Sequence, residues 1–521
     1  MLQSKAPPNS YRPTQQTSII ENFCYSNGQL SLRLIALFSL PLSLWIILFD
    51  PVINSDGVLY LFTAETYLQS GFSAALSEYP WPFFSVLIAT IQQITHVSLL
   101  ISSQILVSLC YLLMSYAFVR TVSELGGTKS AQFFALLIIS FHPLMADYRS
   151  STMRDPGMWA FMLLALRELL RYAKRPRLRY QLKWIVFIGL AFLFRIETLI
   201  IAIASPLSLA FLNRDKFSSG PKKMLRFVSL PALLFTLATA AFLMLSSEPI
   251  ENFKLLKDFQ HYSLQLSNLM NVISVKSDMV SEALLTHTAK EDAFYAVISV
   301  FITISALNII RAVIPVYLLI LFINQFDSSR IVLNRNARII LNSHLLILGV
   351  YLFLFTLSRQ FNLERYSFQF VIILLLYVPF IFDNLWHTRA SNLKTKIPIA
   401  AVLIVLFLDT VINSDYKKAY INDAAQWLQT TVDKDREIIS NHHHIAYFNG
   451  KTTHKSEDLY LKKETEERPW APGILYAYHA KNQEEPALRK RINMNKGHII
   501  KEFRGQKKGI VILFELPSQI K

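Results

Sequence analysis

The sequence predicts an α-helical polytopic membrane protein with about 11 transmembrane helices and a small C-terminal α/β domain outside the membrane. First, the 521 residues are 52% hydrophobic and only 17% charged, whereas soluble proteins average about 25% charged residues. Second, long apolar runs recur along the chain, and the charges between them are clustered. Third, the last hundred or so residues are hydrophilic and of mixed charge. Two cysteines, Cys24 and Cys110, are too few for a disulfide scaffold.

The expected crossings come from apolar runs, because a helix needs about 20 such residues to span a bilayer. The runs are 31–49, 99–119, 131–141, 158–170, 184–212, 227–245, 296–323, 339–357, 368–385 and 397–408. The first run follows a polar stretch and lacks a cleavage-site pattern, which indicates an uncleaved anchor rather than a signal peptide. The segment 82–98 is interpreted either as an interfacial helix or as the start of one long helix.

The sides of the loops follow from Lys and Arg, which accumulate on the cytoplasmic side. Four basic clusters are therefore expected there, at 171–183, 214–226, 330–338 and 389–396. Because the first two clusters flank the run 184–212, this run must cross twice and turn near Arg195 and Glu197. The stretch 50–80 has four acids and no Lys or Arg, so it is expected outside. Topology thus explains the net charge of +16, and no nucleic-acid partner is expected.

Counting crossings from these assignments divides the chain into three parts. Residues 1–30 form a cytoplasmic tail, 31–413 the transmembrane domain, and 414–521 an extracytoplasmic α/β domain. The expected outer loops of the transmembrane domain are 50–80, 142–156, 247–295 and 358–366. In the last domain, the pattern predicts a helix at 419–428 and strands at 437–440 and 509–515.

Asp56 is the first candidate catalytic residue. It lies in the first outer loop, and Tyr60, Ala64, Tyr67 and Gly71 follow at mostly helical spacing, which places Asp56 at the start of a short helix along the membrane. Charged residues close to the membrane core are costly and usually functional. A carboxylate there is suited to general-base work on an acceptor hydroxyl. The structural alternative is that Asp56 is the N-cap of the helix.

A second charged cluster, at 142–156, contains Arg149, Arg154 and Asp155. Guanidinium groups form charge-assisted, bidentate hydrogen bonds to oxyanions, so the two arginines suit a phosphate. Asp155 directly before Pro156 also fits a helix cap. The alternative is that the arginines bind lipid headgroups or pair with neighbouring acids.

Two further charged pairs lie beside expected crossings. Arg195 and Glu197 occupy the tight turn, where they form either a functional pair or a simple ion pair. Arg359 and Arg365 precede a crossing, and they suit either phosphate binding or interfacial anchoring together with Tyr366.

The sequence contains no clear motif for binding a metal ion or a nucleotide. The three consecutive histidines at 442–444 cannot all face one ion, and no Asp, Glu or Cys lies near them at ligand spacing. A loop or helix start is expected there instead. Walker A, Gly-x-Gly-x-x-Gly and Ser-elbow motifs are missing from the sequence. We therefore expect no cofactor, and a divalent metal stays open as an alternative that the sequence does not support.

The order of these motifs resembles the GT-C superfamily, whose multispanning glycosyltransferases use lipid-phosphate-linked sugars. Bacterial protein O-mannosyltransferases and lipid A aminoarabinose transferases are members. The matching segments are 55–64 with Gly71, 79–82, 142–143 with 154–156, 194–197, 364–366, 416–428 and 436–450. Each matching segment is short. The resemblance depends on the order of the segments along the chain and on their expected position on the same side of the membrane.

The resemblance implies roles for individual residues. The family's catalytic acid maps onto Asp56, and its second acid maps onto Asp155. Gly57 stands where some relatives have another acid, a departure that speaks against a metal site. The family's arginines near the lipid phosphate map onto Arg154, Arg195 and Arg365. Together with Tyr60, Arg149, Glu197 and Arg359 from the sequence pattern, they make up the residues expected to bind the lipid phosphate or the substrate.

The implied activity is an inverting transfer of a hexose or pentose from a polyprenyl-phosphate donor to a hydroxyl of a glycan, lipid or protein. Asp56 would deprotonate that hydroxyl. The expected location is the bacterial inner membrane, among its lipids, with the N-terminus cytoplasmic and the C-terminal domain periplasmic. Two alternatives stay open: a flippase or transporter of lipid-linked sugars, and an inactive GT-C-like scaffold that only binds.

Overall fold

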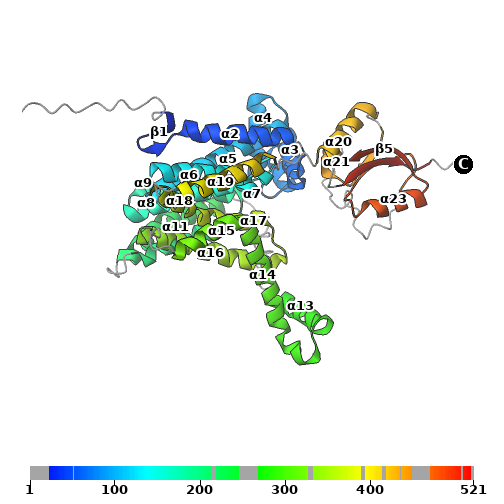
Figure 1. The fold of residues 1–521 in the computed structure, drawn as a ribbon. Helices are drawn as coiled ribbons and strands as arrows, with labels where there is room; N and C mark the ends of the chain where they lie inside the picture. Colours follow the sequence, from blue (N-terminus) through cyan, green and yellow to red (C-terminus); the bar gives the residue numbers. More distant parts are fainter. Residues whose placement is uncertain are drawn as a thin grey trace, which may run out of the picture.

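A computed structural model describes most of the chain, and it contains a helical bundle with a small sheet domain at one end (Figure 1). The described residues are 23–50, 52–212, 219–245, 268–326, 333–388, 393–412, 418–433, 436–448, 470–505 and 509–517. Residues 1–22 of the predicted tail, the section 246–267 of the predicted loop 247–295, and parts of the predicted basic clusters lie outside them.

The bundle begins after a two-stranded hairpin of β1 (Tyr25–Ser26) and β2 (Gln29–Leu30). Several of its helices start at Ser or Thr residues whose hydroxyls accept a backbone N–H of the first turn, as Ser31, Ser98 and Thr128 do. The helical elements are α2 (Leu32–Phe49), α3 (Ser55–Glu78), α4 (Phe83–Thr95), α5 (Leu99–Glu124), α6 (Lys129–Ser140), α7 (Pro143–Arg149), α8 (Asp155–Lys174), α9 (Leu178–Phe194), α10 (Thr198–Ala204), the 3-10 helix η1 (Ser205–Phe211), α11 (Ser219–Leu245), α13 (Leu269–Ala283), the 3-10 helix η3 (His287–Asp292), α14 (Ala293–Val313), α15 (Pro315–Phe326), α16 (Arg335–Arg359), α17 (Glu364–Leu375), α18 (Val378–Thr388) and α19 (Leu393–Ile412).

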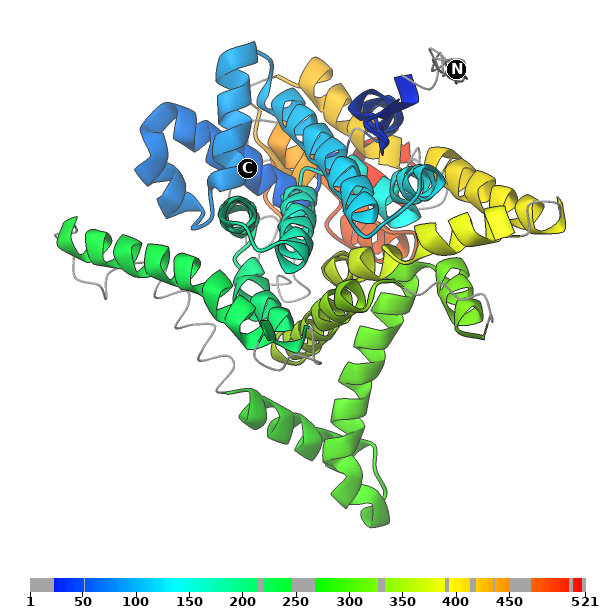
Figure 2. The same ribbon diagram turned by 90° about the vertical axis from the view of Figure 1, so that its left-hand side faces the viewer.

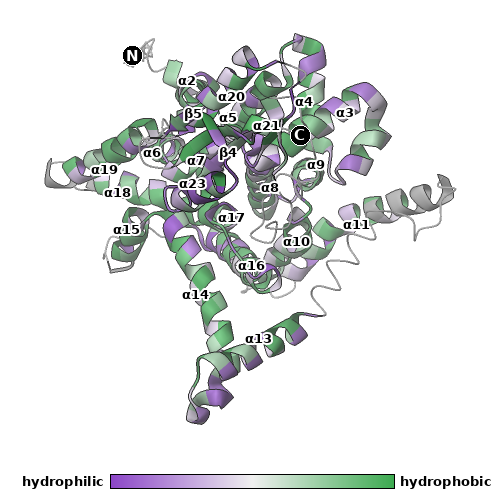
Figure 3. Ribbon diagram, turned by 90° about the vertical axis from the view of Figure 1, so that its right-hand side faces the viewer, coloured by the Kyte–Doolittle hydropathy of each residue, from purple (hydrophilic) through white to green (hydrophobic). Residues whose placement is uncertain are grey.

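The chain is an integral membrane protein. Among the described residues, five helical stretches are long and apolar enough to span a bilayer, and a sixth results if α6 and α7, which meet at 51°, form one bent span. Leu48, Leu346 and Ile404 on the surface of the bundle are more than half exposed, as expected for side chains that face lipid rather than water. Figures 2 and 3 show that α14, with α13, projects from the bundle, and Figure 3 shows many hydrophobic residues along the helices of the bundle. The total of about 11 crossings stays a prediction.

Three of the predicted segments are interrupted in the structure. The run 184–212 breaks between α9 and α10, at the predicted turn. The run 296–323 is divided into α14 and α15, because Ile314 has a left-handed φ of 72° and Pro315 lacks an N–H to continue the helix. The segment 82–98 is not the start of one long helix, because His96 ends α4 in the left-handed region (φ 57°).

Helix α8 lies at the centre of the bundle and connects its two ends. Trp159, Leu163 and Leu166 are fully buried, and the helix packs against both α5 and α9. At 1.5 Å per residue, its 20 residues cover about 30 Å. Charged groups at its N-terminus and at its C-terminus therefore belong to opposite ends of the bundle.

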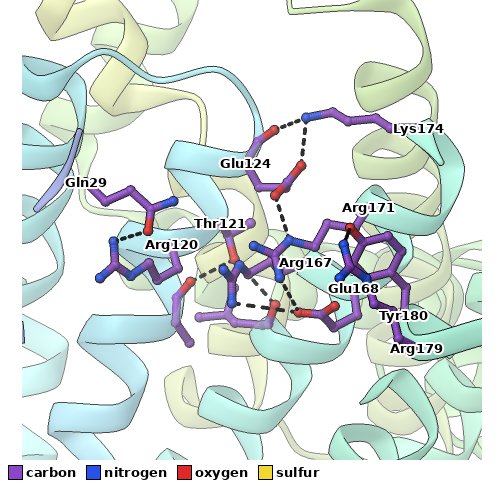
Figure 4. A network of polar contacts seen from close by, with 12 residues as sticks. Gln29, Arg120, Thr121, Glu124, Arg167, Glu168, Arg171, Lys174, Arg179 and Tyr180 are labelled. Carbon is purple, nitrogen blue, oxygen red and sulfur yellow. Dashed lines mark hydrogen bonds and ion pairs between the residues drawn. The ribbon is translucent and has the colours of Figure 1, made fainter. Parts of the chain in front are cut away.

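The C-terminal end of α8 carries a polar network (Figure 4). Glu124 on α5 accepts from Arg171 and from Lys174, each at 2.8 Å, and Arg171 also pairs with the buried Glu168 at 3.0 Å. The two basic side chains belong to the cluster predicted at 171–183. Their carboxylate partners give them a structural role at the end remote from the sheet domain.

The sheet domain is a four-stranded sheet of order β3-β4-β6-β5, in which β3 and β4 are parallel and the other pairs antiparallel. Its core has two layers, because the alternating side chains of β4 and β6 pack against α20 on one face and against α23 and Trp470 on the other. The predicted helix and both predicted strands are present. The elements are α20 (Ala419–Thr431), β3 (Ile438–Ser440), α21 (His443–Phe448), β4 (Leu475–Ala480), α23 (Glu485–Met494), β5 (His498–Arg504) and β6 (Ile510–Glu515).

Candidate functional site

Asp56 and Arg365 form an ion pair at the end of the bundle next to the sheet domain. Asp56 lies in the first turn of α3, and Arg365 lies in the first turn of α17. Arg365 Nη1 donates to Asp56 Oδ2 at 2.8 Å, while 40% of the Asp56 side chain stays exposed. The N-cap of α3 is Asn54, so the alternative interpretation of Asp56 as the cap is wrong. The carboxylate is thus fixed by one guanidinium and still accessible.

Asp155 and Glu197 hold Arg195 between them. Arg195 Nη1 donates to Asp155 Oδ1, and its Nη2 donates to Glu197 Oε1 at 2.8 Å. The side chains of Arg195 and Asp155 are only 6% and 5% exposed, so each charge depends on its partner. Arg195 comes from the break between α9 and α10. Asp155 is the first residue of α8, and the cap is Arg154 rather than Asp155.

Tyr366 joins the two ion-pair groups into one site. Its ring lies 5.3 Å from the Arg195 guanidinium carbon and 4.9 Å from that of Arg365. Its hydroxyl accepts a hydrogen bond from Arg365 Nη2 at 2.9 Å. The sequence pattern indicated Tyr366 as a membrane anchor and as part of the matching segment 364–366, without a role of its own in the site. In the structure its ring stacks on both arginines, and stacked aromatic rings orient guanidinium planes.

Arg154 differs from the other arginines of the site in its partners. Its guanidinium carbon lies 5.6 Å from the ring of Tyr79, whose ring centroid in turn is 5.7 Å from that of Tyr60. Within the described part of the chain, Arg154 forms no hydrogen bond or ion pair that would neutralise it. A cation in an aromatic setting, whose carboxylate neighbour Glu197 is already bonded to Arg195, is suited to an anionic ligand. Tyr60 itself is buried and belongs to the bundle core.

One of the sequence-predicted arginines, Arg149, is held by a different set of residues. Arg149 is 1% exposed, donates from Nη1 to the Ser39 carbonyl oxygen at 3.0 Å and to Ser43 Oγ at 2.8 Å, and stacks on the Tyr111 ring at 4.6 Å. Its contacts connect α7 to α2 and α5. Arg359 is exposed at the last residue of α16.

Close packing around Gly57 sets the position of Asp56. A Cβ at Gly57 would lie 2.7 Å from Asn54 Oδ1 and 2.9 Å from Thr152 Cβ. Asn54 Nδ2 also donates to the Thr152 carbonyl oxygen at 3.3 Å. Glycine therefore allows the first turn of α3 to lie directly on the loop before α8, so that Asp56 and Asp155 share one end of the bundle. No second acid fits beside Asp56.

The described residues contain no cluster that could hold a metal ion. Nowhere among them do three His, Cys, Asp or Glu residues lie close enough together. The histidines at 442–444 lie at the start of α21, as predicted from their spacing.

Comparison with solved structures gives the fold. ArnT from Cupriavidus metallidurans, bound to undecaprenyl phosphate, is similar with a TM-score of 0.50 and 12% identity over 92% of this chain and 97% of that chain. The oligosaccharyltransferase from Archaeoglobus fulgidus, in complex with Zn and sulfate, has a TM-score of 0.47 and 14% identity over 84% of this chain and 58% of that chain. No family model and no curated protein matches the sequence. The chain therefore shares the fold of this ArnT over most of its length.

Proposed function

We propose that the protein is a membrane glycosyltransferase that moves a sugar from a polyprenyl-phosphate donor to an acceptor hydroxyl. The observation that carries the proposal is the placement of Asp56, Arg154 and Arg365 at one end of the bundle: an accessible carboxylate paired with Arg365, and a second cation over the Tyr79 ring. The similar ArnT was solved with undecaprenyl phosphate bound. We take that lipid phosphate as the carrier used here.

In the proposed reaction, Asp56 accepts the proton of the acceptor hydroxyl as its oxygen attacks the anomeric carbon. The bond from that carbon to the phosphate oxygen breaks, and the lipid phosphate leaves with the electron pair, so the configuration inverts. Arg365 holds one oxygen of Asp56 and orients the other. Arg154 stabilises the charge that grows on the leaving phosphate.

The other residues of the site act around this centre. Asp155 and Glu197 hold Arg195 in place by ion pairs, and Arg195 stacks on Tyr366. Through Tyr366, this group keeps Arg365 in position next to the donor. We assign the transmembrane part to 31–413 and the sheet domain to 414–521. In the proposed orientation, the site and the sheet domain face the periplasm of a bacterial inner membrane, the N-terminus is cytoplasmic, and the acceptor is a glycan, lipid or protein.

The test uses the full-length protein in lipid nanodiscs with undecaprenyl-phosphate hexoses and pentoses as donors. Wild type should release undecaprenyl phosphate in the presence of an envelope extract as acceptor. Asp56→Asn should slow release by at least about 100-fold, the lower range for a general base. The exposed Asp278 on α13 gives the matched control Asp278→Asn, which should keep the wild-type rate.

Near-wild-type release by Asp56→Asn contradicts the assigned base. Movement of the intact donor across a liposome membrane without release of lipid phosphate favours a transporter. Binding of donor without either process favours an inactive scaffold.

A further inference from the structure

The residues just before α3, 52–54, lie between the bundle and the sheet domain. Val52 packs into the core of the sheet domain with Ile421 and Ala424, whereas Ile53 packs into the core of the bundle. Asp50 accepts from Ser150 Oγ at 2.8 Å and pairs with Lys418 at 3.6 Å. The backbone that leads to Asp56 is therefore shared by both parts of the protein.

Two histidines of α21 bind the backbone of Ile53 from both sides. The Ile53 N–H donates to His444 Nδ1 at 3.1 Å, and His443 Nε2 donates to the Ile53 carbonyl oxygen at 2.8 Å. Both peptide groups of one residue are thus satisfied by side chains of the sheet domain. Ile53 lies three positions before Asp56, so this contact holds the approach to the first turn of α3.

The two contacts require different protonation patterns. His444 accepts through Nδ1, so its ring is neutral with the proton on Nε2, and the side chain is fully buried. His443 must carry a proton on Nε2 because a carbonyl oxygen only accepts. A short amide side chain can replace either ring: Asn offers an oxygen near the Nδ1 position, and Gln offers an NH₂ near the Nε2 position.

We infer that His443 and His444 are positioning residues, through which the sheet domain holds Asp56 in place beside Arg365. The inference rests on the proposed function for its catalytic consequence. Its structural part, the clamp on Ile53, does not. The sheet domain is then a part of the catalytic apparatus, because the first turn of α3 depends on it for the hydrogen bonds of Ile53.

The direct experiment measures amide hydrogen exchange of the segment 52–58 in the full-length protein in nanodiscs. His444→Leu removes the acceptor of the Ile53 N–H, so exchange there should accelerate about fivefold or more, the effect of one lost hydrogen bond. His444→Asn should restore protection to within about twofold of wild type. His498→Ala, an exposed histidine of β5 in the same domain, is the control and should leave exchange unchanged.

The kinetic experiment uses the undecaprenyl-phosphate sugars of the transfer assay. His444→Leu should lower kcat between about tenfold and 100-fold, because a small misplacement of a catalytic group costs that much. KM for the donor should change less than about twofold, because Arg154 is untouched. His444→Asn should recover kcat. Unchanged exchange or unchanged kcat in His444→Leu overturns the inference, as does an Asn variant that folds but is not rescued.

A second pair covers the case in which His444→Leu fails to fold. His443→Ala and His443→Gln then make the same comparison at the Ile53 carbonyl oxygen, with loss expected in the first and rescue in the second. If Asp56→Asn abolishes release and both histidines prove dispensable, this inference alone is wrong. If Asp56→Asn is active while exchange responds as expected, the clamp stands and the proposed function fails.

Discussion

Arg365 Nη1 and Asp56 Oδ2 lie 2.8 Å apart, although 309 positions separate the two residues in the sequence. The pair joins the first turn of α3 to the first turn of α17, so two helix starts from opposite halves of the chain meet at one point. The carboxylate and the guanidinium therefore lie at the same end of the bundle. The geometry leads to separate predictions for the base, the phosphate ligand and the packing beneath them.

The first prediction concerns the partner of the base. Arg365→Ala should lower kcat by about 100-fold or more, because Asp56 loses its orienting donor and the site loses a cation. Arg365→Lys should recover part of kcat, since it keeps the charge but cannot reach Asp56 and Tyr366 with one planar fork. Release of undecaprenyl phosphate measures both.

The control for Arg365 is Arg311→Ala, an exposed arginine at the end of α14. It should keep the wild-type kcat. Equal activity of Arg365→Ala and Arg311→Ala would remove the ion pair from the mechanism.

The second prediction concerns the lipid phosphate. Arg154→Ala should weaken binding of undecaprenyl phosphate about tenfold to 100-fold, the range of a charge-assisted hydrogen bond of 1.5–3 kcal/mol. Arg154→Lys should bind with an intermediate Kd. Titration of nanodisc-embedded protein with the lipid phosphate, with Arg311→Ala as control, gives the Kd. An unchanged Kd in Arg154→Ala would exclude Arg154 as the ligand of the phosphate.

The third prediction concerns close packing under Asp56. Gly57→Ala should destabilise the fold by about 1–3 kcal/mol, because the new Cβ meets Asn54 and Thr152 at under 3 Å. It should also lower kcat by displacing the first turn of α3. Gly189→Ala on α9 is the matched control: nothing lies within 4 Å of its Cβ, so stability should stay equal or rise. Thermal unfolding in detergent compares the two, and equal melting temperatures would contradict the packing argument.

The individual members of the site were accessible from the sequence, whereas their pairing was not. Asp56, Arg195 and Arg365 each stand out because charges are rare and costly between apolar runs. The local pattern of apolar residues does not show which carboxylate pairs with which arginine, because each ion pair depends on how helices distant in the sequence pack together. Asp155 meets Arg195, and Asp56 meets Arg365, only in the folded bundle.

In the sheet domain, too, some elements could be predicted from the sequence and others could not. The helix at 419–428 and the strand at 509–515 have clear apolar patterns and were predicted. Strand β5 and helix α23 were missed because charged residues interrupt their apolar patterns, and because only Leu488 and Ile492 of α23 pack against the sheet. The role of the histidines at 442–444 was hidden as well, because their partner is the backbone of a residue about 390 positions earlier.

The fourth prediction concerns the buried charges. Arg195→Met should destabilise the protein by about 3–5 kcal/mol, because it leaves two neighbouring carboxylates, Asp155 and Glu197, without their cation. Adding Asp155→Asn to this variant should recover part of the loss, since one buried charge is removed. The exposed Arg33→Met on α2 is the control. Thermal unfolding compares the stability of these variants. A double variant less stable than Arg195→Met would contradict the explanation by unpaired buried carboxylates.

The last prediction concerns acid and the docking of the sheet domain. Burial lowers the pKa of His444 to about 3, with a further contribution from His443, and burial lowers the pKa of His442 to about 2, with further contributions from its charged neighbours. When the domain undocks, these rings return toward about 6.5. Between about pH 3 and 6.5 the undocked state therefore binds more protons, and docking weakens as pH falls; above 6.5 it is constant. The titratable or charged groups around them are His443, His479, Lys418, Asp50 and Asp56.

Protection of the Ile53 amide, corrected for intrinsic exchange, measures this linkage. It should be flat from pH 7.5 to 6.5 and then fall by up to about tenfold per pH unit for each buried histidine, equal to about 1.4 kcal/mol. His444→Asn cannot titrate, so its slope should be shallower than that of wild type, while its protection at pH 7.5 stays close to wild type. Since Asn keeps the acceptor for the Ile53 N–H but removes the proton, the variant separates hydrogen bonding from titration. An identical slope in both proteins would assign the acid response to His442, His443 or His479 instead of to His444.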